Sequence, residues 1–303
     1  MLGFHRILLA TDFSPGATAA LHYAAALAHL SPATLQVLHV IDTRVATFSR
    51  WTDVFRSTEV LATRTASDTT MFQTLLKEPD LTGLSVTPLL QHGHPAEHII
   101  DAAADVDLVV LGTQGGAASS TLGTVARAVV HASPAAVLLV PPACPVPVPP
   151  PGELPLLPVQ HLVLALHVVR YAPQALALSQ ALARLCQASL SVLQVLDPAT
   201  FRSYRLDAGG GLSYNLEGTY ALLQKRLEDV VPDTFAPTVE RLVRIGDTVE
   251  TILQHLRDRQ ADLVVLSVHT YGNLKKIFTT STVDALLQQL PCPLLAVPLP
   301  PET

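Results

Sequence analysis

The sequence predicts an α/β fold in two tandem copies, each built around a five-stranded parallel sheet. At 303 residues the chain is longer than one hydrophobic core usually organises, and domains average about 150 residues. Its residues are 49% hydrophobic and only 15% charged, which suits buried parallel strands covered by helices. The two halves also repeat one another. We therefore expect one domain at 1–142, a linker at 143–160 and a second domain at 161–303.

The internal repeat consists of five blocks that recur in the same order. ILLATDFSPGATAAL, which starts at Ile7, matches LVLALHVVRYAPQAL from Leu162, and TLQVLHVID from Thr34 matches SLSVLQVLD from Ser189. The later pairs are HGHPAEHII with IGDTVETIL, DLVVLGTQG with DLVVLSVHT, and SPAAVLLVP with LPCPLLAVP. Between the copies, nine of the twenty residues at 141–160 are proline, which predicts an extended polyproline II spacer.

Within the first copy, short apolar runs alternate with helical segments, as in βαβ units of a parallel sheet. Helices are expected to start at Pro15 after Ser14 and at Pro95 after His94, with a long helix inside 54–77. Ligands of such folds bind beyond the carboxyl ends of the strands, where the strand order reverses. The expected strands are 6–11, 35–41, 85–92, 108–112 and 136–140.

Composition argues against several classes of protein. The net charge of −6 and the lack of a Lys/Arg-rich run argue against a nucleic-acid partner. No apolar run reaches the roughly 18 residues that cross a bilayer, so we expect no membrane association. Cys144, Cys186 and Cys292 are far apart and form no CxxC pair, which favours the reducing cytoplasm over a disulfide framework or a thiolate zinc site.

Six segments carry a resemblance to a known family: ILLATDFS, LHVID, HGHP, LVVLGTQGG, LGTVARAVV and PAAVLLVP. They resemble the successive signature segments of universal stress proteins, and the resemblance extends over both halves. It implies an adenine nucleotide, ATP or AMP, above the sheet. In that family an Asp after the first strand, backbone at the end of the second, and a G-x-x-G-(nine residues)-G-[ST] stretch hold the nucleotide.

Carried onto the first copy, the resemblance implies a nucleotide site with Asp12 at the nucleoside end and glycine backbone at the phosphates. Glycines let backbone approach phosphates, and a helix N-terminus attracts anions. Only seven residues separate Gly115 from Gly123, against nine in the family pattern. Plain turn and capping chemistry is the alternative for these residues. The implied site residues are Thr11, Asp12, Val40, Leu111, Gly112, Gly115, Gly123, Thr124 and Val125.

The second copy departs from this pattern, and we expect its site to be lost. Each replacement adds a Cβ where backbone must approach phosphate and makes a left-handed conformation costly, by about 1 kcal/mol each. Lys275 and Lys276 could attract an anion, or could belong to a solvated loop. The replacements are His167 for Asp12, Ser267 for Gly112, Thr270 for Gly115, and Thr280 with Ser281 for Gly123 with Thr124.

The resulting interpretation is a non-enzymatic stress-response protein that holds a nucleotide in its first copy and acts through a protein partner. No Walker A loop, G-x-S-x-G elbow or H-E-x-x-H pair is present. Two alternatives stay open: an ATP-using enzyme of the related nucleotide α-hydrolase-like group, and a structural module with both sites inactive. His92, His94 and His98 have a spacing that could bind a metal, with surface histidines as the alternative.

We predict that the two copies pack as an intrachain pseudo-dimer, with a further homodimer left open. The last strand of each copy, 137–140 and 294–297, is an apolar sheet edge, and exposed edges invite pairing. An experimental structure of the whole chain would contradict this prediction if the two domains made no contact.

Overall fold

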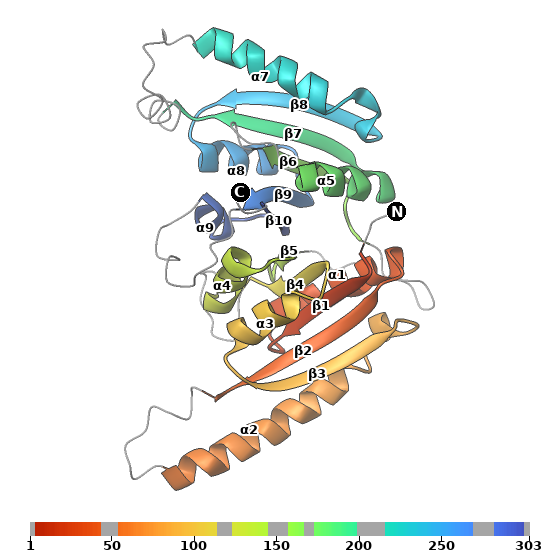
Figure 1. The fold of residues 1–303 in the computed structure, drawn as a ribbon, viewed down its shortest axis with the longest axis vertical. Helices are drawn as coiled ribbons and strands as arrows, with labels where there is room; N and C mark the ends of the chain where they lie inside the picture. Colours follow the sequence, from red (N-terminus) through yellow and green to blue (C-terminus); the bar gives the residue numbers. More distant parts are fainter. Residues whose placement is uncertain are drawn as a thin grey trace. The chain divides into compact units, whose positions relative to one another are not determined.

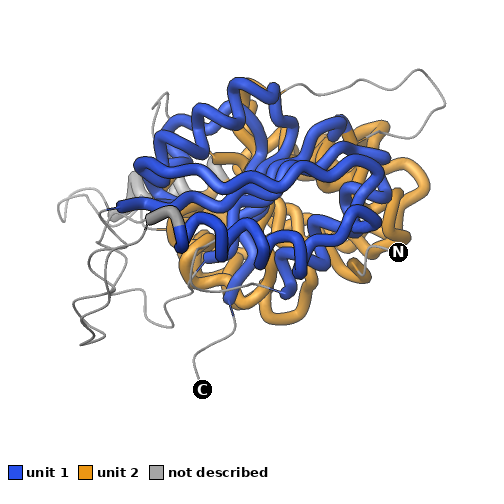
Figure 2. The backbone as a smooth tube through the Cα atoms, turned by 90° about the horizontal axis from the view of Figure 1, so that it is seen from above, with its two compact units in different colours: residues 1–2, 158–269, 278–303 blue, residues 3–157, 270–277 orange. Residues whose placement is uncertain are grey.

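A computed structural model describes residues 4–43, 54–113, 123–144, 157–166, 173–198, 216–268 and 282–299. Their contacts divide the chain into two compact units (Figure 2). Described residues up to Leu157 belong to the first half's unit, and those from Pro158 onward to the second half's unit. Residues 145–156 of the predicted linker lie outside the described residues, so the domain boundaries stay a prediction.

The first unit holds the predicted five-stranded parallel sheet, in the order β3-β2-β1-β4-β5. Every strand begins and ends within one residue of its expected position, so the α/β fold class is confirmed for this unit. Its elements are β1 (Arg6–Thr11), α1 (Pro15–Leu30), β2 (Thr34–Asp42), α2 (Val54–Leu75), η3 (Pro79–Leu81), β3 (Val86–Gly93), α3 (Pro95–Ala103), β4 (Leu108–Gly112), α4 (Thr124–Ala132) and β5 (Ala136–Val140).

The second unit repeats this topology in the order β10-β9-β6-β7-β8, again with parallel pairing. The internal repeat in the sequence is therefore a repeat of structure. Its elements are β6 (His161–Leu166), α5 (Pro173–Leu185), β7 (Ser189–Leu196), α7 (Leu216–Val230), η4 (Asp233–Phe235), β8 (Thr238–Ile245), α8 (Thr248–Asp258), β9 (Leu263–Val268), α9 (Thr282–Leu287) and β10 (Leu294–Pro298).

The central strands are apolar because helices cover both faces of each sheet (Figure 1). Ile7, Leu8 and Leu9 of β1 are fully buried although neighbouring side chains point to opposite faces. Right-handed crossovers require the helices that follow β1 and β2 to cover one face and those that follow β3 and β4 to cover the other. The strand order reverses between β1 and β4, which is where such folds form a crevice.

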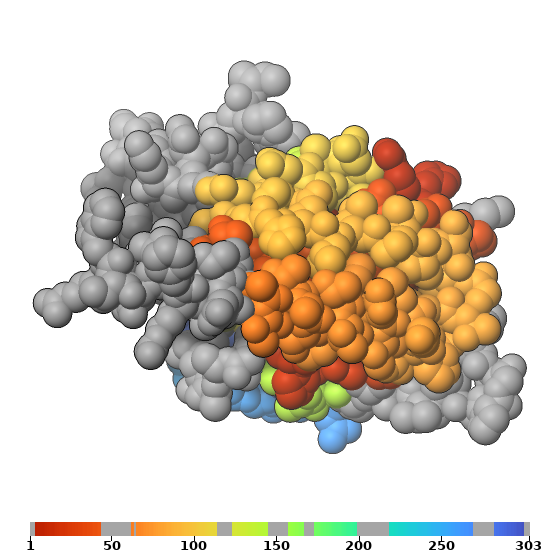
Figure 3. Space-filling model, turned by 90° about the horizontal axis from the view of Figure 1, so that it is seen from below, coloured from red at the N-terminus to blue at the C-terminus, as the bar shows by residue number. Residues whose placement is uncertain are grey.

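Helix α2 follows β2 and lies on the outer side of the first unit beside β3 (Figures 1 and 3). Phe72 and Asp68 are buried on its inner side, whereas Met71 is 40% exposed. Within the described ranges, no helix is both long enough and apolar enough to cross a membrane.

One carboxylate fixes the start of the first strand in each unit. Asp107 Oδ2 accepts hydrogen bonds from the amides of His5 and Arg6, at 2.7 and 2.9 Å. Asp262 Oδ2 does the same for Gln160 and His161, at 2.8 and 2.9 Å. The aspartate that opens each DLVVL block therefore holds β1 to β4, and β6 to β9, through backbone amides. The aspartate recurs in both copies because it makes the same pair of hydrogen bonds in each.

Gly93 ends β3 in a conformation that side chains avoid. Its φ is +144°, and a Cβ there would lie 2.5 Å from His98 Nε2. Gly246 at the end of β8 has φ +158°, and its Cβ would lie 2.9 Å from Thr251 Oγ1. Both glycines allow the chain to turn tightly from an outer strand into the following helix.

The three cysteines are free thiols, as expected from their spacing. Burial raises the pKa of Cys144 to about 12 and that of Cys186 to about 11. The thiolate is the reactive form of cysteine, so both side chains are held in an unreactive state.

Two histidines of the second unit favour their neutral forms. Burial lowers the pKa of His161, and the Arg259 guanidinium lowers it further. The Glu240 and Asp262 carboxylates raise this pKa, but their effect is smaller. Burial and then Arg259 also lower the pKa of His255. The His161 ring lies between two hydroxyls, with Nδ1 2.6 Å from Ser189 Oγ and Nε2 3.0 Å from Ser191 Oγ.

We predict that acid destabilises the second unit through these histidines. Below about pH 6.5 the unfolded chain takes up protons that the folded unit resists, so the free energy of unfolding falls as the pH falls. Urea unfolding at a series of pH values should show a smaller acid loss for the double variant His161→Gln/His255→Gln. The control is His5→Gln, at an exposed position of the first unit. Equal pH slopes for the double variant and wild type would contradict the prediction.

Candidate functional site

A cavity of about 330 Å³ opens at the carboxyl ends of β1, β2 and β4. The turn after β1, the end of β2, the inner side of α2 and the starts of α3 and α4 form its walls. It therefore lies where the strand order reverses, the position at which open α/β sheets bind ligands.

Eight of the nine residues implied by the sequence line this cavity, although they come from four separate segments of the chain. Gly115 lies outside the described residues. The eight are Thr11, Asp12, Val40, Leu111, Gly112, Gly123, Thr124 and Val125.

The turn after β1 is held by its own side chains. The amide of Phe13 donates to Thr11 Oγ1 at 3.1 Å, and the amide of Ser14 donates to Asp12 Oδ1 at 3.1 Å. Ser14 Oγ in turn accepts from the Ala17 amide and caps α1. Phe13 has φ 61°, a left-handed conformation that is uncommon for an aromatic residue. Asp12 thus both shapes the turn, as the capping alternative requires, and presents an exposed carboxylate at the cavity.

Gly112 ends β4 directly against the first turn of α1. A Cβ at this position would lie 2.6 Å from the Gly16 carbonyl carbon and 2.9 Å from the Ala17 amide nitrogen. Its φ is outside the left-handed range. The expectation of a left-handed conformation at Gly112 is therefore wrong. A glycine is needed here because the backbone of β4 lies directly against the backbone of α1.

Gly123 is the N-cap residue of α4, at the helix start that the resemblance to universal stress proteins implies. Its φ is −61°, so the left-handed expectation is wrong here too. No side chain caps this helix, and the Gly123 amide donates to the Thr113 carbonyl at 2.8 Å. The amides of Thr124 and Val125 lack intrahelical acceptors at this helix start, so the wall of the cavity is attractive to an anion.

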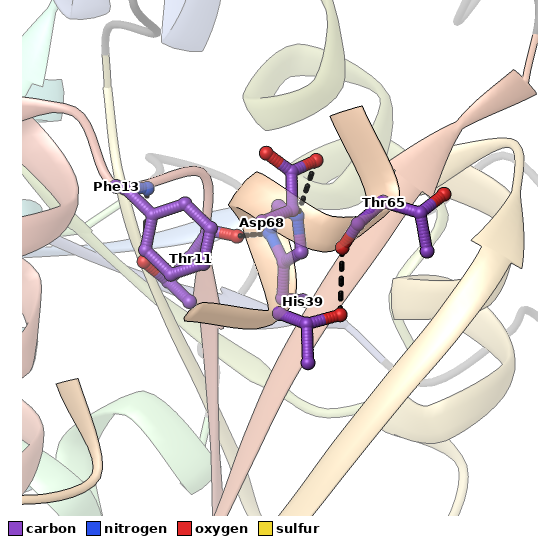
Figure 4. A network of polar contacts seen from close by, with 6 residues as sticks. Thr11, Phe13, His39, Thr65 and Asp68 are labelled. Atoms are coloured by element: carbon purple, nitrogen blue, oxygen red, sulfur yellow. Dashed lines mark hydrogen bonds and ion pairs between the residues drawn. The ribbon is translucent and has the colours of Figure 1, made fainter. Parts of the chain in front are cut away.

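His39 and Asp68 are cavity residues that the sequence interpretation missed (Figure 4). His39 is only 6% exposed, and its Nδ1 donates to the Thr11 carbonyl at 2.8 Å. Its Nε2 lies 3.4 Å from Asp68 Oδ2, and its ring centroid lies 4.4 Å from that of Phe13. A histidine inside the apolar LQVLHVI run was a usable signal for His39, whereas nothing in the pattern of α2 marked Asp68.

The charged side chains of the cavity are mainly acidic. Asp12, Asp42 and Asp68 line it together with His39, and its described lining contains no Lys or Arg. The anion-attracting feature is instead the start of α4.

The three histidines that could have formed a metal site lie at the turn from β3 into α3 and take part in its local structure. His98 Nε2 donates to the His92 carbonyl at 3.1 Å, and His94 is the N-cap residue of α3. Over the parts of the chain that are described, no three His, Cys, Asp or Glu side chains group as a metal site would require.

The equivalent region of the second unit differs where it is described. The registers of β1 with β2 and of β6 with β7 place Gln194 at the position of His39 and Leu166 at that of Thr11. Ser267, the last residue but one of β9, pairs with Val297 as Gly112 pairs with Val140. The remaining replaced residues, His167, Thr270, Thr280 and Ser281, lie outside the described residues, as do Lys275 and Lys276.

Comparison with known proteins identifies the family. The model of the universal stress protein family matches residues 3–141 and 159–298, so the chain belongs to this family and contains two copies of its domain. Among curated proteins, none matches this sequence.

Two solved structures that span both copies agree with this chain in fold. A universal stress protein from Archaeoglobus fulgidus aligns with a TM-score of 0.65 and 16% identity over 97% of this chain and 96% of its own. A putative universal stress protein from Pseudomonas aeruginosa aligns with a TM-score of 0.60 and 13% identity over 98% and 94%. A universal stress protein in complex with cAMP aligns with a TM-score of 0.35 and 14% identity over 46% and 96%.

We predict that Gly112→Ala destabilises the first unit by about 1–3 kcal/mol, because the added methyl meets backbone that cannot rotate away. Urea unfolding measures the loss. Ser267→Ala is the matched control at the equivalent position of the second unit, where a Cβ is already present, and we expect it to change little. A stable Gly112→Ala variant would show that α1 can move away from β4.

Proposed function

We propose that this protein holds one adenine nucleotide per chain, in the cavity of its first unit, and acts in the stress response through a protein partner rather than by catalysis. The observation that carries the proposal is the gathering of eight predicted residues from four segments around one cavity. ATP and AMP are both candidates. The cytoplasm is the proposed location.

The cavity supports an orientation for the nucleotide. Carboxylates accept hydrogen bonds from hydroxyl and amino groups, which a nucleoside offers and a phosphate at neutral pH does not. Asp12 is therefore suited to the nucleoside end. The amides at the start of α4, which have no intrahelical acceptor, suit a phosphate, since helix N-termini attract anions.

The same residues give little support to a catalytic role. Ser14, the hydroxyl nearest to Asp12 in sequence, accepts a hydrogen bond from the Ala17 amide and serves as a helix cap. A nucleophile needs a positioned base within hydrogen-bond reach, and the histidine of this cavity is directed at Thr11 and Asp68 instead. This arrangement favours a binding role.

Binding should occur at one site per chain. Isothermal titration with AMP and with ATP should give one site in wild type, and an affinity at least about tenfold lower in Gly123→Val, equal to about 1.4 kcal/mol. The branched side chain would stand at the start of α4, where the phosphate is proposed to lie. Asp12→Ala should weaken binding as well.

The control for this titration is Thr280→Val, which changes the corresponding sequence position of the second copy and should leave binding unchanged. Circular dichroism checks that each variant is folded. Two sites per chain, or binding indifferent to Gly123→Val and Asp12→Ala, would refute the assignment. Mass spectrometry of small molecules released on acid denaturation identifies a nucleotide that copurifies.

A further inference from the structure

Four polar side chains of the second unit form one row of hydrogen bonds near the amino ends of β6, β7 and β8. His161 Nδ1 lies 2.6 Å from Ser189 Oγ, and His161 Nε2 lies 3.0 Å from Ser191 Oγ. The Ser191 hydroxyl donates to Glu240 Oε2 at 3.2 Å. Arg259 pairs with Oε1 of the same carboxylate. We call His161, Ser189, Ser191 and Glu240 the His161 relay.

The hydrogen bonds of the His161 relay fix where its protons lie. A carboxylate only accepts, so the Ser191 proton points to Glu240. Ser191 Oγ then accepts from His161, and Nε2 carries the ring proton. In a neutral ring, Nδ1 is left with a lone pair, and this lone pair faces Ser189 Oγ at 2.6 Å. The relay therefore directs the Ser189 proton at a base.

The Gln160 carbonyl is a second acceptor within reach of the Ser189 hydroxyl, at 3.1 Å. With the proton directed there, lone pairs of Ser189 Oγ and His161 Nδ1 would face each other at 2.6 Å, which is unfavourable. The shorter hydrogen bond to the ring is therefore preferred. The backbone amide of His161 also donates to Asp262, at 2.9 Å, which holds the base in place beside the hydroxyl.

The surroundings of His161 keep its ring neutral and able to accept a proton. Burial lowers the pKa of His161, and Arg259 after α8 lowers it further, whereas Glu240 on β8 and Asp262 before β9 act in the opposite direction. His255 on α8 also interacts with His161 and favours its own neutral form. Once His161 has taken a proton, the two carboxylates stabilise the imidazolium.

Only one of the two hydroxyls can be reached from solvent. Ser191 is fully buried, whereas Ser189, the first residue of β7, is partly exposed. A hydroxyl within hydrogen-bond reach of an oriented neutral base is the arrangement of an activated nucleophile. Ser189 therefore combines activation with access.

The first unit has a hydroxyl at the same place but no imidazole beside it. The strand registers place Arg6 where the second unit has His161, and Thr34 where it has Ser189. A guanidinium only donates hydrogen bonds, so Arg6 cannot take a proton from Thr34. The relay is thus a difference between the two copies, and Gln36 and Thr87 stand at the positions of Ser191 and Glu240.

We propose that Ser189 is a modification site of the second unit, where its hydroxyl takes an acyl group from a neutral activated ester with His161 as the base. Ser189 Oγ forms a bond to the ester carbonyl carbon, and the bond from that carbon to the leaving oxygen breaks. The serine proton passes through His161 Nδ1 to the leaving group. The serine is consumed, so the reaction modifies the chain without turnover, and it is independent of the nucleotide proposed for the first unit.

The relay also defines the class of acyl donor. Base assistance accelerates such reactions by about 10²–10⁴-fold, so the donor must have a good leaving group, such as a phenolate. Glu240 and Asp262 lie close enough to act on the His161 ring, and their negative charges would repel an anionic donor. A neutral aryl ester fits both conditions.

The test is incubation of the full chain with p-nitrophenyl acetate at about pH 7.5, where imidazoles are mostly neutral. Peptide mass spectrometry locates and quantifies the acetyl groups with time, which separates Ser189 from background labelling of amines. His161→Gln should lower the rate of Ser189 acetylation at least about tenfold, because the base is lost. Ser191→Ala should lower it as well, since the ring proton can then move to Nδ1. Circular dichroism checks that each variant is folded.

The matched control is Thr34→Ser, which places a serine at the equivalent position of the first unit, opposite Arg6. Within this one variant, the introduced serine should be acetylated at least about tenfold more slowly than Ser189, because it has no base beside it. Equal rates at the two positions would overturn the proposal, as would an unchanged rate at Ser189 in folded His161→Gln.

The pH profile of wild type tests the same assignment without a variant. Between about pH 6.5 and about pH 7.5 the rate of Ser189 acetylation should change little, because His161 is already neutral across this range. An unassisted hydroxyl reacts as its alkoxide, and its rate would rise about tenfold over that interval. Such a rise would also overturn the proposal.

Discussion

The candidate site depends on the contact between the end of β4 and the first turn of α1. Gly112 brings its backbone against Gly16 and Ala17, at distances that would place a Cβ 2.6 Å from a carbonyl carbon. This contact sets where α1 begins, and therefore where the capping residue Ser14 and the turn with Asp12 lie. The start of α4 forms the opposite wall of the cavity. It is held by the residue after β4, because the Thr113 carbonyl accepts a hydrogen bond from the Gly123 amide. Both ends of the cavity are therefore positioned by Gly112 and Thr113, at the end of β4 and directly after it.

The two units share the contacts that build the sheet and differ in the contacts that shape the cavity. Asp107 and Asp262 make the same pair of hydrogen bonds, and Gly93 and Gly246 make the same turn. Gln194, in contrast, stands where the first unit has His39. A neutral amide replaces an imidazole at this position, so the second unit offers different hydrogen-bonding groups there. The copies therefore differ at positions that line the cavity of the first unit.

Local patterns predicted the strands and the Ser14 cap, because these depend on a few consecutive residues, whereas the helix start at Gly123 was implied by the resemblance to universal stress proteins. The meeting of residues from the ends of β1, β2 and β4 at one cavity was also predictable, since carboxyl ends of parallel strands meet at one edge of a sheet. Two features were not predictable in this way. Gly112 is required by a helix that packs from another part of the chain, and not by its own φ. Asp68 becomes a partner of His39 only once α2 folds back over β2, so its role arises from tertiary packing.

The acidic lining limits how a ligand can be oriented in the proposed function. Asp12, Asp42 and Asp68 line the cavity at the end formed by β1, β2 and α2, and their negative charges would repel a phosphate. Hydroxyl and amino groups can donate to those carboxylates, whereas a phosphate finds favourable partners in the amides at the start of α4.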